Sequence, residues 1–318
     1  MTGMEEFTHI PVLPEETIAL LGEGKTGKVR FVDGTCGCGG HSSLLLKAFP
    51  EAELLGIDRD EEALRRSGKT LAFAGERVKL VHGEFADIER IATENGFTNV
   101  DGVLLDIGVS SPQIDDGERG FSFRKNGPLD MRMDRSGRKT ASQILNTYSQ
   151  EALKKIFRDY GELQEAGRLA SAVCKARELK PFATTEEFAH LCENVLQKGK
   201  RKGGLPAPTL PFQALRMEVN GELDQLRKGL EGALHLLKAG GRLAVISFHS
   251  LEDRIVKNFF SDMARDCQCP PGLPVCICNW KPELKILTKK VIIAGEDEIK
   301  TNSRAGCAKL RGAEKLSK

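Results

Sequence analysis

A glycine-rich turn and two acidic residues have the types and spacing that could bind a small charged ligand. The turn, residues 33–41, reads DGTCGCGGH and lies between a short apolar segment and an expected helix. Its glycines permit positive φ angles and let backbone N–H groups approach a ligand closely. Asp58 closes the next apolar segment, 21 residues after Gly37, where a carboxylate can bind both hydroxyls of a ribose. Asp106 closes a later apolar segment in the same way.

Two cofactors bind to such a layout, a nicotinamide dinucleotide and S-adenosylmethionine (SAM). The turn has the pattern D-x-T-x-G-x-G-G, not G-x-G-x-x-G, and Asp33 ends the segment before it. SAM has no pyrophosphate to place at a helix N-terminus, and Asp33 could attract the ammonium group of its methionine end. The sequence therefore favours SAM, bound by Asp33, Gly37 and Asp58. The structural alternatives are a helix cap for Asp33 and a solvent-exposed acid for Asp58.

Residues after the third and fourth apolar segments would complete this site. Phe85, in the string HGEFAD (82–87), could pack on the adenine ring, and packing in the core is an equally good interpretation. The fourth segment leads into DIGVSSPQ (106–113), which resembles the Ser-Pro-Pro-aromatic loop of enzymes that methylate amino groups.

A loop of this kind suits methylation of an exocyclic amine. The amine of cytosine is a poor nucleophile because its lone pair is delocalised into the ring. Acceptors that hold its N–H groups can orient the lone pair toward a sulfonium methyl group, so that the reaction needs mostly positioning. We predict Asp106, Ser110 and Ser111 for this role, and a plain turn is the alternative for Ser110-Ser111-Pro112.

Helices alternate with the apolar segments over the first hundred residues. Strands are expected at 29–33, 54–58, 78–82 and 103–106, with helices at 42–48, 61–68 and 88–95. Such alternation predicts parallel strands joined by right-handed crossovers, which is a doubly wound α/β sheet. Later elements are expected as a helix at 215–237 closed by Gly240-Gly241, a strand at 243–248, a helix capped by Ser250 and Asp253, and a strand-like run at 286–293.

The middle of the chain has a different pattern. Residues 112–140 are predicted to be loop, and residues 142–196 read as helical, with Thr184 and Glu187 at capping-box spacing. We expect an α/β domain, residues 1–111 and 208–318, interrupted by a mostly helical substrate-recognition insert at 112–207.

Eight strings occur in the order in which a known family has them. They are HIPVL (9–13), GGHS (39–42), GIDRD (56–60), LLDIGVSSPQ (104–113), ERGFSF (118–123), GPLDMRMD (127–134), FQALRMEVNGEL (212–223) and SFHSLEDR (247–254). Through them the chain resembles the ribosomal RNA small subunit methyltransferase H (RsmH/MraW) family over nearly its whole length.

The resemblance implies a class I SAM-dependent methyltransferase with an inserted helical domain. It implies N4-methylation of a cytidine in the decoding centre (P-site region) of bacterial 16S rRNA, in the small ribosomal subunit. The SAM ligands that it implies are Gly39, Gly40, His41, Asp58, Phe85, Asp106 and Gln113. A non-catalytic ribosome-assembly factor that binds SAM is one alternative function, and an NAD-dependent dehydrogenase is another.

Three segments are locally basic, although the net charge is only +2. Residues 119–139 hold seven Lys/Arg against two Asp, residues 198–202 four against none, and residues 281–318 ten against five acids. Such segments suit an RNA backbone, or are solvated faces. Phe121 and Phe123 could stack an extruded base or pack in the core. Arg132 and His249 are further substrate-binding candidates, with a structural hydrogen bond as the alternative for His249.

Composition indicates a globular protein of the cytoplasm with no membrane partner. The 318 residues are 40% hydrophobic, no apolar stretch is long enough to span a membrane, and the acidic N-terminus lacks a secretory pattern. Cys267-x-Cys269 and Cys276-x-Cys278 could bind zinc, but structural zinc more often uses C-x-x-C spacing, so we expect reduced thiols and no metal. The sequence leaves the oligomeric state open, a homodimer included.

Overall fold

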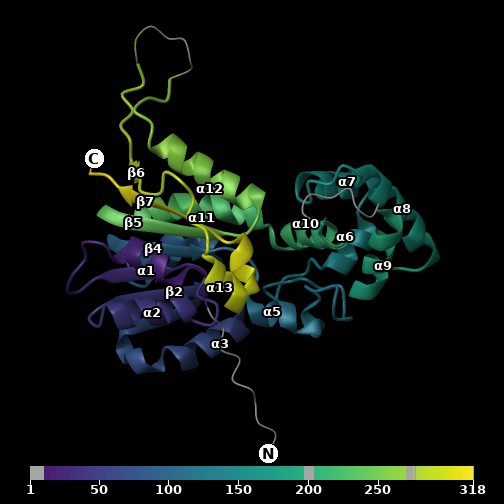
Figure 1. Cartoon of the computed structure of the whole chain (residues 1–318), viewed down its shortest axis with the longest axis horizontal. Coiled ribbons are helices and arrows are strands. Elements are labelled where there is room, and N and C mark those ends of the chain that lie inside the picture. Colours follow the sequence, from purple (N-terminus) through teal and green to yellow (C-terminus); the bar gives the residue numbers. More distant parts are fainter. Residues whose placement is uncertain (1–10, 197–203, 270–274, 276, 318) are drawn as a thin grey trace, which may run out of the picture. The chain divides into compact units, whose positions relative to one another are not determined.

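The structure, a computed structural model, describes residues 11–196, 204–269, 275 and 277–317 (Figure 1). The chain forms two compact units with separate hydrophobic cores. Unit 1 comprises Met1–Gly108 and Leu223–Lys318, and unit 2 comprises Val109–Glu222. The insert expected at 112–207 falls within unit 2, and the basic string at 198–202 lies outside the described residues.

A seven-stranded sheet forms the centre of the described part of unit 1. Its strands are β1 (Arg30–Asp33), β2 (Glu53–Asp58), β3 (Val78–His82), β4 (Val100–Asp106), β5 (Leu237–Ser247), β6 (Leu284–Ile286) and β7 (Lys309–Lys315). They lie in the order β3-β2-β1-β4-β5-β7-β6. Strands β1 to β5 are parallel, whereas β7 is antiparallel to both β5 and β6. This is a doubly wound α/β sheet with one antiparallel strand, β7, inserted next to β5, and it confirms the predicted α/β fold class.

Helices cover both faces of the sheet in unit 1 (Figure 1). They are α1 (Pro14–Gly22), α2 (Gly40–Ala48), α3 (Glu61–Thr70), α4 (Ile88–Glu94), α11 (Glu222–Leu236), α12 (Ser250–Met263) and α13 (Glu296–Thr301), with the 3-10 helices η1 (Ala72–Arg77), η2 (Phe85–Asp87) and η5 (Ser303–Cys307). Within the described ranges, no helix has the length and apolar content that a membrane crossing requires.

Successive strand residues enter two different cores. Val32 and Leu105 pack with residues of α4, α11 and α12 on one face, whereas Phe31 and Leu104 pack with residues of α1 and α2 on the other. Strands that are buried on both faces read as continuous apolar runs. This is why the sequence located β1 to β4 to within a few residues.

The register brings the acidic strand ends to one edge of the sheet. Asp33 lies opposite Gly56 on β2 and Leu104 on β4. Asp106 ends β4 beside β5 at the same edge. The carboxyl edge of a parallel sheet, where the strand order reverses, is the place at which such folds bind ligands.

Unit 2 is helical. Its elements are α5 (Ser111–Asp115), η3 (Gly117–Arg119), α6 (Ala141–Thr147), α7 (Gln150–Asp159), α8 (Ala166–Leu179), α9 (Thr185–Val195) and α10 (Thr209–Asn220). The ring of Phe188 stacks between Phe157 and Phe212, with centroid distances of 6.2 and 5.4 Å. The predicted capping box is confirmed at the start of α9, where the backbone N–H of Thr184 donates to Glu187 Oε2 at 3.0 Å.

The prediction of one helix over 215–237 was wrong. Gly221 takes a left-handed conformation, with a φ of 61°, and separates α10 from α11. Glycine adopts this conformation without the steric cost of a Cβ atom, so it ends a helix that the apolar pattern would continue. Gly240-Gly241 also cap no helix, because both lie within β5, where the pairing with β4 shifts register.

Three other expectations are corrected in the same way. The loop predicted at 112–140 contains α5 and η3. Helix α12 is capped by His249 and Glu252, not by Ser250 and Asp253. The tail forms the short strand β6 and then β7, which the sequence missed because the string KLRGAEK has little apolar content.

Candidate active site

The glycine-rich turn joins β1 to α2 through two glycines in the left-handed region. Gly37 has a φ of 55° and Gly39 a φ of 83°. A Cβ atom at Gly39 would lie 3.2 Å from Leu71 Cγ, so a side chain there would be both strained and crowded. The backbone N–H of Cys36 donates to the carbonyl of Ile57 at 2.9 Å, which fixes the turn against β2.

Asp33 lies inside this turn and is only 2% exposed. Ser42 Oγ donates to its Oδ2 at 2.6 Å, and the backbone N–H of Thr35 donates to its Oδ1 at 3.1 Å. Burial raises the pKa of the Asp33 carboxyl above its usual value. Asp33 therefore holds the turn in shape from within, and its contact with the SAM ammonium group stays a prediction.

Asp58, at the end of β2, is fixed by two backbone donors. The N–H of Gly37 donates to its Oδ2 at 2.7 Å, and the N–H of Asp60 donates to its Oδ1 at 2.8 Å. Partial burial is the largest effect on the side chain and raises the pKa of Asp58 to about 6. Each carboxylate oxygen has a further lone pair, so ligand hydroxyls can still be bound.

Asp106 and His41 face each other with unused hydrogen-bonding capacity. His41 Nε2 lies 3.5 Å from Asp106 Oδ2, and the His41 side chain is only 5% exposed. Within the described part of the chain, neither ring nitrogen of His41 nor Asp106 Oδ1 has a hydrogen-bond partner, although all three atoms are buried. Buried polar atoms without partners are costly and rare in native proteins, so these atoms point to a ligand.

Phe85 lies in η2, which follows β3, and its side chain is partly buried. A Cβ atom at Gly229 would lie 2.5 Å from Phe85 Cδ2, so the ring packs closely on α11. One side of the ring therefore contributes to the core of unit 1. Contact of the ring with adenine stays a prediction.

The loop residues after β4 belong to unit 2. Ser110 is the N-cap residue of α5, and its backbone N–H donates to Gln113 Oε1 at 3.0 Å. Gln113 is 6% exposed, and Ser111 is the first residue of the helix. The sequence alternative of a plain turn is replaced by a capped helix start. The roles predicted for Ser110, Ser111 and Gln113 in methyl transfer and SAM binding stay predictions.

The three other substrate-binding candidates of unit 2 have clear structural contacts. Phe123 packs edge-on against Phe212 with ring centroids 5.5 Å apart, and the guanidinium of Arg119 lies over the Phe121 ring at 5.8 Å. Arg132 forms two hydrogen bonds of 2.7 Å to the Asp130 carboxylate. These contacts orient the side chains, and no observation tests their contact with RNA.

His249 caps α12 in unit 1. Its Nδ1 accepts a long hydrogen bond of 3.4 Å from the backbone N–H of Glu252, and its Nε2 lies 2.9 Å from Glu252 Oε1. The Glu252 carboxylate in turn accepts from the backbone N–H of Phe248 at 2.9 Å. This is the structural hydrogen bonding that the sequence offered as the alternative to substrate contact.

Comparison with known proteins identifies the family. The MraW methylase family matches residues 6–316. The chain belongs to this family. The Ribosomal RNA small subunit methyltransferase H of Syntrophotalea carbinolica is 51% identical over 313 residues, 98% of this chain and 99% of that protein. The protein of the same name from Geobacter sp. (strain M21) is 48% identical over 98% of this chain and 100% of its own length.

The chain is also similar to solved methyltransferase structures. A putative rRNA-methylase from Clostridium thermocellum has 11% sequence identity and a TM-score of 0.45, with 97% of this chain and 98% of that chain covered. An rRNA methylase from Streptococcus thermophilus has 12% identity and a TM-score of 0.42 over 95% of each chain.

The cofactor of this MraW family member is SAM. The residues at the carboxyl edge of the sheet fit it. Asp58 is an acceptor of suitable kind for ribose hydroxyls, and the buried His41 and Asp106 side chains retain atoms without a hydrogen-bond partner in the described chain that a polar ligand can satisfy. Gly37 and Gly39 shape the turn between these residues through their left-handed conformations. Which of these residues contact SAM stays a prediction.

Sequence reasoning overlooked two hydroxyl groups. Thr35 Oγ1 accepts a hydrogen bond of 2.6 Å from the backbone N–H of Asp106, and so ties the end of β1 to the end of β4. Ser42 holds Asp33. Both lie in strings that the sequence singled out, but their partners are far apart in the chain.

Sequence reasoning also overlooked two side chains that donate hydrogen bonds to the backbone of the GPLDMRMD string in unit 2. Arg119 is 4% exposed, and its Nη2 donates to the carbonyls of Arg132 and Met133 at 3.1 and 3.0 Å. Asn220 Nδ2 donates to the carbonyl of Met131 at 2.8 Å, and Met131 has a φ of 63°. Arg119 and Asn220 also lie in strings of the resemblance, which was the available signal.

Proposed function

We propose that this chain methylates N4 of a cytidine in the decoding centre of 16S rRNA, in the small ribosomal subunit and in the cytoplasm. The name of its relatives, Ribosomal RNA small subunit methyltransferase H, supports an rRNA substrate. The family match favours a methyltransferase over an NAD-dependent dehydrogenase. The structural observation that carries the proposal is the buried, unpartnered Oδ1 of Asp106 at the carboxyl edge of the sheet.

The residues of this edge have two tasks in such a reaction. SAM, when bound, supplies a methyl group on a positively charged sulfur. Asp58 binds the ribose hydroxyls, and the turn at Gly37 and Gly39 lets backbone approach the cofactor closely. The carboxylate of Asp106 accepts hydrogen bonds, either from the cofactor or from the cytidine amine. An acceptor on the amine turns its lone pair toward the methyl group, which is catalysis by positioning.

The reaction itself is tested with labelled cofactor. Small subunits from cells that lack this protein are incubated with the pure chain and methyl-labelled SAM, and nucleosides from the digested 16S rRNA are separated by mass. We expect the label in N4-methylcytidine from one decoding-centre position. Label in another nucleoside would contradict the proposed target. No incorporation into subunits that a known relative methylates would support a non-catalytic, SAM-binding assembly factor.

The Asp106→Asn variant assigns the role of this carboxylate. The backbone N–H of Asp106, not its side chain, makes the hydrogen bond to Thr35, so the variant retains the contact between β1 and β4. We expect SAM affinity to fall by about 1–3 kcal/mol, from lost hydrogen bonds to a charged group. A fall in kcat at unchanged SAM affinity would assign Asp106 to the amine. The matched control is Glu53→Gln, at the exposed start of β2.

The basic segment of unit 2 supports an RNA partner. Arg124, Arg135 and Arg138 are exposed within residues 119–139, whereas Arg132 in the same segment is paired with Asp130. Exposed arginines neutralise phosphates and release counterions, so binding weakens with salt. The Arg135→Ala/Arg138→Ala double variant should weaken rRNA binding. The slope of the logarithm of the binding constant against the logarithm of salt concentration should become less steep by about 1 for each lost phosphate contact. Arg158→Ala, an exposed arginine paired with Asp159 on α7, is the control.

A further inference from the structure

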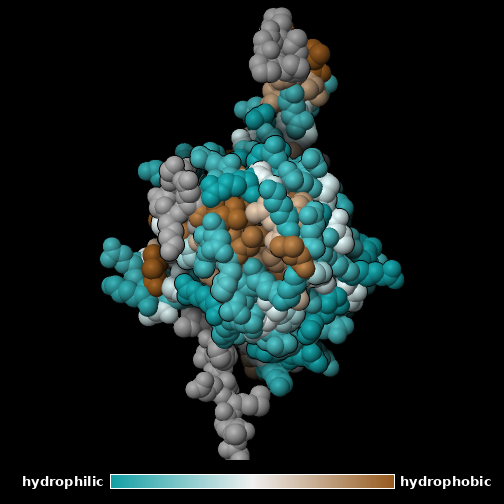
Figure 2. All heavy atoms as spheres, turned by 90° about the vertical axis from the view of Figure 1, so that its right-hand side faces the viewer, coloured by the Kyte–Doolittle hydropathy of each residue, from teal (hydrophilic) through white to brown (hydrophobic). Residues whose placement is uncertain are grey.

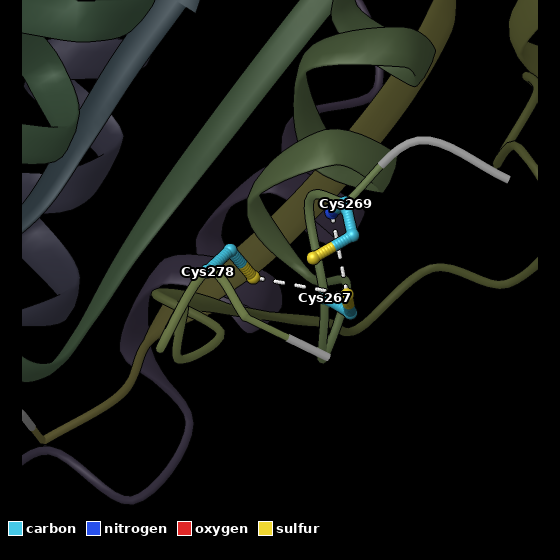
Figure 3. A group of neighbouring side chains, drawn as sticks. All are labelled: Cys267, Cys269 and Cys278. Carbon is cyan, nitrogen blue, oxygen red and sulfur yellow. Dashed lines mark hydrogen bonds between the residues drawn. The ribbon is translucent and has the colours of Figure 1, made fainter. Parts of the chain in front are cut away.

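Three cysteine sulfurs converge in the segment between α12 and β6 (Figure 3). The Sγ atoms of Cys267, Cys269 and Cys278 all lie within 4.8 Å of one another. Cys267 Sγ and Cys278 Sγ are 3.7 Å apart, which is well beyond the ~2.05 Å of a disulfide bond. It is close to the ~3.8 Å that separates two ligands of a tetrahedral zinc ion with Zn–S bonds of ~2.3 Å.

Backbone N–H groups point at each of these sulfurs. The N–H of Cys269 donates to Cys267 Sγ at 3.3 Å, that of Gln268 to Cys278 Sγ at 3.4 Å, and that of Ile277 to Cys269 Sγ at 3.4 Å. These contacts fix the positions of the three sulfurs. Three sulfurs held this close together can act as ligands of one soft metal ion.

Two large apolar side chains among the described residues of this segment are exposed instead of packed. Val275 and Ile277 are 70% and 76% exposed, and Figure 2 shows hydrophobic atoms at the surface of this segment, where it extends beyond the rest of unit 1. Its base is closed by two hydrogen bonds, from Trp280 Nε1 to the carbonyl of Arg265 at 3.0 Å and from Glu283 N to the carbonyl of Met263 at 2.8 Å. Small elements without a core are commonly held by a metal or by disulfides.

We propose that Cys267, Cys269 and Cys278 bind a structural zinc ion that joins the two arms of this segment. Soft thiolate ligands select zinc over the hard cations Mg²⁺ and Ca²⁺, which prefer oxygen. Each thiol loses a proton to solvent when its sulfur binds the ion, so binding weakens at low pH. Cys276 lies outside the described residues, and the proposal does not include it. The site takes no part in methyl transfer, so its failure and that of the proposed function are separable.

Elemental analysis of the full chain tests the proposal directly. The chain is purified anaerobically from zinc-supplemented cells, and bound metals are measured by mass spectrometry. We expect about one zinc ion per chain. Cys267→Ser and Cys278→Ser should each lose most of it. Cys307→Ser, which removes an exposed cysteine in η5, is the matched control and should retain the zinc.

A second measurement guards against a variant that fails to fold. Binding of SAM to each variant reports whether the sheet is intact, and Co²⁺ added to the metal-free wild-type chain reports the ligands. Thiolate ligation should produce an intense near-ultraviolet charge-transfer band that is weaker in Cys278→Ser. Absence of both zinc and this band, or a disulfide between Cys267 and Cys278, would overturn the proposal. Stoichiometric iron or copper in place of zinc would overturn the assignment to zinc.

Discussion

At the carboxyl edge of the sheet and in the cysteine segment, backbone N–H groups donate to side-chain atoms and fix their positions. At the sheet edge, backbone N–H groups of Gly37 and Asp60 hold the carboxylate of Asp58. In the cysteine segment, backbone N–H groups hold the sulfurs, as that of Cys269 holds Cys267 Sγ. In both places, backbone donors fix the position of a side-chain group that can bind a ligand.

The two places differ in what lies beneath them. The sheet edge rests on strand residues that are almost fully buried, such as Ile57 and Leu105, each 0% exposed. The cysteine segment has Val275 and Ile277 on its surface instead. We infer that the geometry of the edge is maintained by the core whether or not SAM is bound, whereas that of the segment depends on its metal ion.

Removal of the metal should have the largest effect, because it should destabilise the cysteine segment and leave the sheet edge unchanged. When a chelator strips the chain, amide exchange in residues 265–269 and 277–283 should accelerate by on the order of a hundredfold, because the binding energy of a structural metal is also folding energy. Strands β1, β2 and β4 should keep their protection. Exchange measured by mass spectrometry with and without chelator gives the comparison. Equal acceleration in the strands would show that the two places are not independent.

Asp58→Ala should have the next largest effect, and it acts at the sheet edge alone. The variant loses the acceptor proposed for the ribose hydroxyls and leaves the N–H groups of Gly37 and Asp60 without it. SAM affinity should fall by about 1–3 kcal/mol, as measured by calorimetry, and zinc content should not change. Glu53→Ala, at the exposed start of β2, is the control. An unchanged affinity in Asp58→Ala would remove the ribose role.

Acidification should weaken SAM binding through the same carboxylate. Burial raises the pKa of Asp58 from 3.8 to about 6, so the group is protonated in much of the SAM-free chain below that pH. Between pH 7 and pH 5 the affinity should fall about tenfold, because protonation removes the charged acceptor. Because the pKa of this acid is raised in the folded chain, its protonation favours the folded state as pH falls in this range, so titration of Asp58 does not promote unfolding. Asp58→Asn should remove the pH dependence; if it persists there, another group titrates.

His249→Ala should have the smallest effect, and it acts on the helix that connects the two places. His249 caps the start of α12, and the cysteine segment follows the end of that helix. Loss of the cap should lower the free energy of unfolding by about 1 kcal/mol, measured by denaturant titration, with zinc retained. His235→Ala, on the exposed end of α11, is the control. If His249→Ala also lost its zinc, the conformation of the cysteine segment would depend on α12 and not on the metal alone.

The sequence predicted the parallel sheet well because its strands are buried on both faces. Strands β1 to β4 read as apolar runs ended by Asp33, Asp58, His82 and Asp106. It could not find the break at Gly221, because apolar periodicity continues through a residue whose effect depends on its φ angle. It could not show that Cys267 and Cys278 lie close together, because C-x-C spacing says nothing about where the chain folds back.

The amino-acid types determined which groups are available: acids at strand ends, glycines free of Cβ strain, hydroxyls and thiols. Their order alone indicated the sheet and its carboxyl edge, because a strand that is buried on both faces consists of consecutive apolar residues. Only the tertiary structure decided which groups meet. Thr35 contacts Asp106, and Cys267 contacts Cys278, because distant segments fold together. That Asp106 Oδ1 has no hydrogen-bond partner among the described residues can be seen only when the neighbouring atoms are known.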